Sequence, residues 1–221
     1  VAENPGPFTY LGTGVYIIGR GEVAVLDPGP AIDRHFEALK AALEGERVTH
    51  VFVTHSHMDH SPLAHPLARW AGCKVYAGGA AIRTESEVRL EAGDDLSFRP
   101  DELVSDGETF EGPGWTIEAV ATPGHTSNHF CFALREENAL FAGDHVMGWS
   151  TTVISPPDGH MGAYLASLEK IRARGYSTIW PTHGPPVRDV RPFLDAYIAD
   201  RKTREDAILA RIEAGDRRIP D

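Results

Sequence analysis

The residues best suited to chemistry in this sequence gather in one short segment, His55-Ser56-His57-Met58-Asp59-His60. Imidazole nitrogen is a preferred ligand of zinc, and carboxylate oxygen is a workable partner. In extended backbone, His55 and His57 point to the same side and can hold one ion. Asp59 and His60 follow past a turn and can reach a second position nearby. The segment therefore predicts a metal site rather than a surface histidine cluster or a helix cap.

Three further residues of ligand type stand apart in the sequence, each beside a glycine: His125 in TPGH, Asp144 in AGDH and His183 in THG. Each alone would more often serve in a turn, a helix cap or the core. A carboxylate, however, has two oxygens and can bridge two ions, which no histidine can do. Together with the first segment they supply five histidines and two aspartates, enough for two neighbouring ions.

Strands and helices must position these residues, and short apolar runs rich in β-branched residues indicate the strands. We expect them at Val15–Ile18, Val23–Leu26, His50–Thr54, Lys74–Ala77, Thr116–Thr122, Phe130–Leu134, Ala139–Ala142 and Thr178–Trp180. Apolar residues recurring at three and four positions predict helices over 31–43, 160–174 and 190–213. The polar stretch 199–206 means that the last helix either breaks there or lies exposed.

Five of the apolar runs end at a residue of ligand type, namely Asp27, His55, His125, Asp144 and His183. In open sheets, functional groups gather in loops beyond the carboxyl ends of strands. We therefore expect five loops to meet on one edge. Because strands and helices alternate, the chain is expected to form an α/β or α+β sandwich in one domain.

The motifs THSHMDH, TPGH, AGDH and THG, in this order and spacing, resemble the metallo-β-lactamase superfamily from roughly residue 10 to 187. The resemblance implies an α+β fold, the four-layer αββα sandwich, with two zinc ions per chain at one edge; manganese and iron are the alternatives. It assigns the first ion to His55, His57 and His125. It assigns the second ion to Asp59, His60 and His183, and Asp144 to the bridge between the two ions. Asp27 matches an early aspartate that orients ligands.

Two residues differ from those found in other branches of the superfamily, and these differences narrow the choice of branch for this chain. The commonest zinc β-lactamases have cysteine where Asp144 stands, and the flavo-diiron branch has glutamate where His57 stands. The stretches after Asp144 and His183 are most similar to the lactamase-beta-2-like branch, which includes endoribonucleases specific for single strands. Cleavage of single-stranded RNA is thus the first expectation, and hydrolysis of a β-lactam or thioester carbonyl is the alternative. A mononuclear iron oxygenase acting on persulfides and a non-catalytic binding module are less favoured.

The expected reaction uses a hydroxide bridged between the two ions, because two cations lower the pKa of a shared water toward about 7. Asp59 is the expected catalytic residue, orienting the nucleophile or accepting its proton. Ser56 has no base free of metal duty beside it and is rejected as a nucleophile. The acid that protonates the leaving group is left open among His129, His145, His160 and Tyr164.

The resemblance divides the 221 residues into a hydrolase domain, 1–187, and a helical extension, 188–221, which is expected to begin a winged-helix-like module. Ile208, Leu209 and Ile212 reappear after the polar gap, so we expect further residues beyond the last one to cover them. Two well-separated cysteines, no long apolar window and no visible export signal favour the cytoplasm and no membrane partner.

The net charge is −11, and residues 85–111 hold ten acids against two arginines, or −8. No basic strip suits a polyanion, so no double-stranded DNA partner is expected. The expected partner is a small molecule or single-stranded RNA, and the oligomeric state is not readable. A modest basic edge for RNA would come from Arg188, Arg191, Arg201, Lys202 and Arg204.

Overall fold

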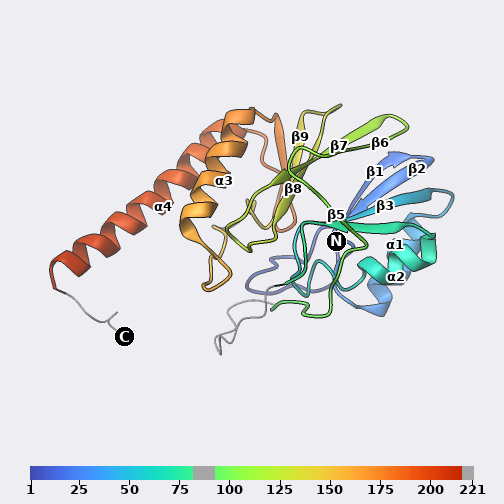
Figure 1. The fold of residues 1–221 in the computed structure, drawn as a ribbon, viewed down its shortest axis with the longest axis horizontal. Helices are drawn as coiled ribbons and strands as arrows, with labels where there is room; N and C mark the ends of the chain where they lie inside the picture. Colours follow the sequence, from blue (N-terminus) through green and yellow to red (C-terminus); the bar gives the residue numbers. More distant parts are fainter. Residues whose placement is uncertain (82–92, 216–221) are drawn as a thin grey trace.

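The computed structural model describes residues 1–81 and 93–215, and it shows two β-sheets packed face to face with helices on both outer sides (Figure 1). This is the αββα sandwich that the sequence predicts, so the fold class is confirmed. The acidic segment 85–111 is described only from residue 93 onward.

The first sheet has the strand order β1-β2-β3-β4-β5, with β1 antiparallel to β2 and the other neighbours parallel. Helices α1 and α2 cover its outer face, where they share an apolar cluster with β2, β3 and β4. The elements are β1 Tyr16–Arg20, β2 Glu22–Leu26, α1 Asp33–Ala42, β3 Arg47–Val53, α2 Ala64–Ala71, β4 Lys74–Ala77 and β5 Glu102–Leu103.

The second sheet has the order β10-β9-β8-β7-β6, in which only β10 and β9 are parallel neighbours. Helices α3 and α4 pack on its outer face around Leu168, Ile171 and Leu194. The elements are β6 Thr109–Gly112, β7 Trp115–Ala121, β8 Phe130–Leu134, β9 Ala139–Gly143, α3 Met161–Arg174, β10 Thr178–Pro181 and α4 Val190–Glu213.

Between the sheets lies a third apolar cluster, built largely of aromatic side chains such as Phe52, Trp115 and Phe132. The rings of Phe52 and Phe132 come from opposite sheets, and their centroids lie 4.9 Å apart. Interdigitated contacts of this kind hold two sheets at a fixed separation. The strand ends from which the loops begin are therefore held at fixed positions.

All eight expected strands and all three expected helices are present, with their ends shifted by a few residues. Helix α2 and strands β5 and β6 are not among the elements predicted from the sequence. Helix α2 has only eight residues, including Pro66, so its period is hard to detect. Strand β5 has two exposed residues, and β6 is a short strand without a buried position. Weak burial leaves the two strands with little apolar signal in the sequence.

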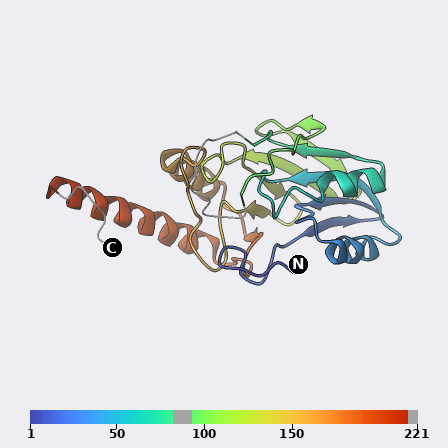
Figure 2. The same cartoon turned by 90° about the horizontal axis from the view of Figure 1, so that it is seen from below.

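The last helix does not break. Helix α4 runs continuously, with Val190, Leu194, Tyr197 and Ile198 buried, and every residue from 202 to 215 is exposed. Figures 1 and 2 both show its second half projecting away from the body. None of the described helices is long and apolar enough to cross a membrane. The division of the chain at residue 187 stays a prediction.

The turn before His125 depends on Gly124, whose φ is +145°. A Cβ at this position would lie 2.3 Å from the Cα of Tyr164 in α3. The turn can therefore pass close to the helix only without a side chain. Backbone bonding supports the same packing, because His160 donates its N–H to the carbonyl of Gly124 at 2.8 Å.

We predict that Gly124→Ala lowers the free energy of unfolding by about 3 kcal/mol or more, because it adds a backbone clash to an unfavourable φ. Gly107→Ala is the matched control, since Gly107 has φ +81° and a Cβ there would meet nothing within 4 Å. It should cost only about 1 kcal/mol. Urea unfolding of both variants measures the difference, and equal losses would contradict the clash.

Candidate metal centre

The five loops that follow the strand ends do meet on one edge of the sandwich. Strands β2 and β3 are parallel, and β7, β9 and β10 run in one direction in the second sheet. Their carboxyl ends therefore face the same way. All seven expected ligands lie there with at most 9 % of their surface exposed. They form two groups, each with ligand atoms within 4.8 Å of one another: His55, His57, His125 and Asp144, and Asp59, His60 and His183.

In the first group, three imidazole nitrogens converge. His55 Nε2 lies 2.9 Å from His57 Nδ1, and His125 Nε2 lies 3.2 Å from the same atom. Burial, followed by the neighbouring histidines, lowers the pKa of His55 well below its usual range. Burial likewise lowers the pKa of His57 to about 3. Neutral imidazole is the form that binds a metal.

In the second group, Asp59 Oδ2 lies 3.4 Å from His60 Nε2 and 3.1 Å from His183 Nε2. Burial disfavours charge on both histidines, but the carboxylates of Asp59 and Asp144 outweigh it. They hold the pKa of His60 well above its usual range and raise that of His183 to about 10. The carboxylates of this group therefore attract positive charge, which protons supply in the metal-free protein and which a cation could supply instead.

Asp144 faces both groups. Its Oδ1 lies 3.5 Å from His60 Nε2 and 3.3 Å from His183 Nε2, and its Oδ2 lies 3.8 Å from His125 Nε2. One oxygen is thus directed at each group, which is the geometry of a bridging carboxylate.

Asp27 holds two of the ligand histidines in orientation. Its Oδ2 accepts from His60 Nδ1 at 3.0 Å and from the Thr54 hydroxyl at 2.8 Å, and its Oδ1 accepts from Thr54 N–H at 2.8 Å. The Thr54 oxygen lies 3.0 Å from His55 Nδ1 and can accept that proton. Both rings then turn Nε2 toward the site, as histidine ligands supported by a second hydrogen bond do.

Backbone carbonyls orient two more ligands. His125 Nδ1 lies 2.7 Å from the carbonyl oxygen of Val153, and His183 Nδ1 lies 3.4 Å from that of Gly12. In each case Nδ1 is occupied as a donor, and Nε2 is left for the site. Four of the five histidines are therefore set in the same tautomer.

His57 is the exception, because its Nδ1 faces the site and its Nε2 lies 3.7 Å from Asp94 Oδ1. Asp59 is supported differently: its Oδ2 accepts from the Thr13 hydroxyl at 3.1 Å, and Thr13 is bonded in turn to Asn4. The supporting residues Asn4, Thr13 and Asp94 are not predicted from the sequence. They lie in polar loops with no periodicity, so their only signal is their position in space.

These residues fit a pair of divalent ions. His60 Nε2 and Asp144 Oδ1 are buried polar atoms without a hydrogen-bond partner in the described structure. Such atoms are costly to bury unless something binds them. The close approach of the His55, His57 and His125 nitrogens is also suited to a cation between them. The donor set of nitrogen and carboxylate oxygen suits zinc, manganese or iron.

The remaining sequence candidates have other surroundings. His129, His145 and Tyr164 are fully buried, and Tyr164 donates its hydroxyl proton to the carbonyl of His145 at 2.9 Å. His160 caps α3 by accepting from Ala163 N–H at 3.1 Å. Ser56 accepts a hydrogen bond from Asn128, in keeping with its rejection as a nucleophile.

A family model described as the metallo-beta-lactamase superfamily matches residues 10–183. The chain belongs to this superfamily. The expected family is thereby confirmed, and the described residues include two groups of histidines and aspartates that could hold two ions, as a metal-dependent hydrolase of this superfamily requires. Two separate ligand groups weigh against the mononuclear oxygenase.

Two curated relatives and one solved structure illustrate the similarity. An atrochrysone carboxyl ACP thioesterase of Cryptosporiopsis is 30% identical, over 96% of this chain and 62% of the relative. A beta-lactamase-like protein 2 homolog of Caenorhabditis elegans is 34% identical, over 95% and 68%. A metallo-beta-lactamase family protein of Thermus thermophilus has a TM-score of 0.70 at 25% identity, covering 90% of this chain and 77% of its own. The chain thus spans about two thirds of the length of these curated relatives.

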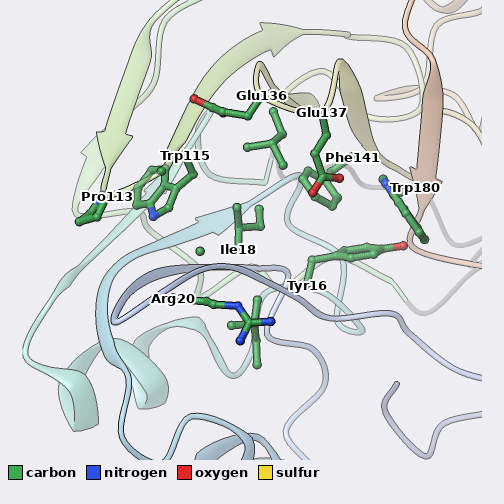
Figure 3. A pocket seen from close by; sticks show the side chains of 13 residues that line it. Tyr16, Ile18, Arg20, Pro113, Trp115, Glu136, Glu137, Phe141 and Trp180 are labelled. Carbon is green, nitrogen blue, oxygen red and sulfur yellow. The ribbon is translucent and has the colours of Figure 1, made fainter.

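A pocket of about 570 Å³ lies along the open side of the sandwich and contains none of the seven ligands. In Figure 3, Trp115 stands at one end and Tyr16 and Trp180 at the other, with Arg20 and Glu136 on facing walls. The Tyr16 hydroxyl donates to the carbonyl of Pro181 at 2.6 Å, which fastens β1 to the end of β10. The pocket is thus a gap between the sheet edges.

We predict that Asp144→Asn weakens metal binding at both groups by about 100-fold or more, since residues that merely orient ligands contribute roughly 10- to 100-fold. Turnover should fall by orders of magnitude. Asp189→Asn is the control, because Asp189 is exposed and its side chain caps nothing. Titration calorimetry with zinc and elemental analysis measure affinity and stoichiometry. Two ions bound as tightly as in the unchanged protein would disprove the bridge.

We predict a smaller effect for Asp27→Asn, which removes the charge that accepts from His60 and Thr54. Metal affinity should fall roughly 10- to 100-fold. The metal-free protein should lose about 1–3 kcal/mol of unfolding free energy, because buried donors lose a charged acceptor. Calorimetry and urea unfolding test the two effects, with Asp189→Asn again as control. An unchanged metal affinity would show that Asp27 does not orient the ligands.

Proposed function

We propose that this chain hydrolyses thioesters, the carbonyl alternative of the sequence analysis, ahead of the RNA cleavage that the sequence first suggested. The similarity to proteins named atrochrysone carboxyl ACP thioesterases, at 30% identity over nearly the whole chain, supports this order. The proposed partner is accordingly an acyl thioester, and zinc is the proposed metal because of the nitrogen-rich donor set.

The observation that carries the proposal is the state of the expected leaving-group acids. His129, His145 and Tyr164 are fully buried, and His160 is committed to capping α3. An alkoxide leaving from phosphorus needs a proton, whereas a thiol with a pKa of about 8.5 leaves readily as the thiolate. A site in which these four side chains supply no acid therefore suits a thioester better than a phosphodiester.

The charges around the site also favour a substrate that is neutral at its reacting group. Asp94 Oδ1 lies 3.7 Å from His57 Nε2, the ring nitrogen that faces away from the site. Asp158 is close enough to Asp94 to raise the pKa of the Asp94 carboxyl, after burial as the larger cause. Two carboxylates beside the first ligand group repel a polyanion. A neutral acyl carbonyl can approach the same place without this penalty.

The basic edge expected along α4 is largely engaged elsewhere. Arg191 pairs with Asp195 at 3.7 Å, and Arg204 pairs with Asp200 at 3.0 Å. Arg201 donates to the carbonyl of Thr152. Since nucleic-acid affinity comes largely from basic groups that displace counterions, this edge offers little to RNA.

Divalent cations held by the two groups would supply a Lewis acid for the carbonyl oxygen and an activated water. The chain's own residues fix the geometry: Asp144 sets the spacing of the groups, and Asp27 holds His60 in its tautomer. Asp59 is proposed to orient the nucleophile, with its Oδ2 steadied by Thr13. Overall, water adds to the acyl carbon, the carbon–sulfur bond breaks, and a carboxylic acid and a thiol are formed.

The test is turnover of an acyl N-acetylcysteamine thioester, nitrocefin and a single-stranded RNA oligomer, each with and without chelator. We expect the thioester to be cleaved in a chelator-sensitive reaction, at a rate at least about tenfold above that of either other substrate. Asp144→Asn serves as the inactive control and Asp189→Asn as the active one. Chelator-sensitive RNA cleavage with an inert thioester would restore the RNA hypothesis and overturn this proposal.

A further inference from the structure

Large apolar side chains are exposed on segments that carry or contact the ligands. We call this set the apolar rim; it consists of Phe8, Tyr10, Leu11, Met58 and Trp149. Isolated exposed apolar residues are normal, but a group of them beside a functional site marks a surface that binds something. The rim stands in contrast to the carboxylates Asp94 and Asp158 beside the first ligand group.

Backbone contacts place the rim next to the ligands. Gly12, two residues after Tyr10, has its carbonyl oxygen 3.4 Å from His183 Nδ1. Gly148, which precedes Trp149, donates its N–H to the carbonyl of His183 at 2.9 Å. Met58 stands between two ligands in the sequence. The rim therefore comes from three separate segments that are each joined to the site.

Two members of the rim are already paired. The rings of Tyr10 and Trp149 are stacked, with centroids 5.3 Å apart and planes 23° from parallel, while 42% and 40% of their surfaces remain exposed. The backbone of Tyr10 has φ +58°, a conformation that residues other than glycine rarely adopt. Two backbone hydrogen bonds with Gly6 hold it there. An exposed aromatic residue whose backbone is kept in an unfavourable conformation indicates a role other than packing.

We propose that Tyr10 and Trp149 bind the acyl part of the substrate, and that this part is an aromatic or similarly flat apolar group. This inference rests on the proposed thioester hydrolysis. Stacked rings at the edge of a site offer a flat face on which a third ring can lie. The pair would set substrate preference and would take no part in the chemical step.

The test compares 2-naphthoyl and acetyl thioesters of N-acetylcysteamine. We expect the metal-loaded protein to prefer the naphthoyl substrate in kcat/KM. Tyr10→Ala and Trp149→Ala should each reduce that preference about tenfold, mainly through KM. Tyr10→Phe and Trp149→Phe should keep most of it, because they retain an aromatic face. Trp70→Ala is the matched control, since Trp70 is 48% exposed on α2 and should not affect the preference.

A binding measurement separates the two proposals. Calorimetric titration with 2-naphthoate needs no turnover, and binding should be lost in Trp149→Ala and kept in Trp70→Ala. Thioester turnover with no naphthoyl preference, or a preference that both alanine variants keep, would overturn the acyl site and leave the hydrolase standing. Absence of any thioester turnover would overturn the proposed function and with it the acyl assignment. Loss of naphthoate binding in Trp149→Ala would then show only an apolar site.

Discussion

The site depends most on the carboxylate of Asp27, which is buried directly beyond β2 and bonded to groups from three other segments. It accepts from Thr54 at the end of β3 and from His60 in the ligand loop, and its Oδ2 lies 3.3 Å from the hydroxyl of Thr182 after β10. A buried carboxylate is stable only when such donors surround it. The hydrogen bonds that stabilise the buried carboxylate of Asp27 also fix the end of one sheet against the other. The positions of the ligand loops follow from this junction.

The two ligand groups differ in charge although they share one edge. The first is rich in imidazole that burial keeps neutral, whereas the second combines two histidines with carboxylates that raise their pKa values. In the metal-free protein, protons on His60 and His183 balance the carboxylates. A cation entering the second group must therefore displace protons, which is not required in the first. Asp144 couples these two environments because it has one oxygen in each.

Much of this could be predicted from the sequence, because it depends on local patterns. Each strand before a ligand is an apolar run, and the spacing of His55, His57, Asp59 and His60 gives a metal-binding motif directly. What escaped prediction depends on contacts between distant segments. Thr13 donates to Asp59, which is 46 residues away in the sequence, and no local pattern around Thr13 predicts this contact. The short elements α2 and β5 escaped because α2 has only eight residues, including Pro66, and β5 has two exposed residues. The ligand motifs likewise do not predict the substrate, because they specify only the residues that bind metal.

Both ligand groups draw residues from both sheets, since His55 to His60 follow β3 while His125, Asp144 and His183 follow strands of the second sheet. Neither half of the molecule can build a complete group alone. During synthesis on the ribosome, the second group is therefore unfinished until His183 has emerged from the exit tunnel. Until then the early histidines offer only partial coordination, open to whichever metal is abundant. Complete coordination in the second group is thus possible only after most of the chain has been made.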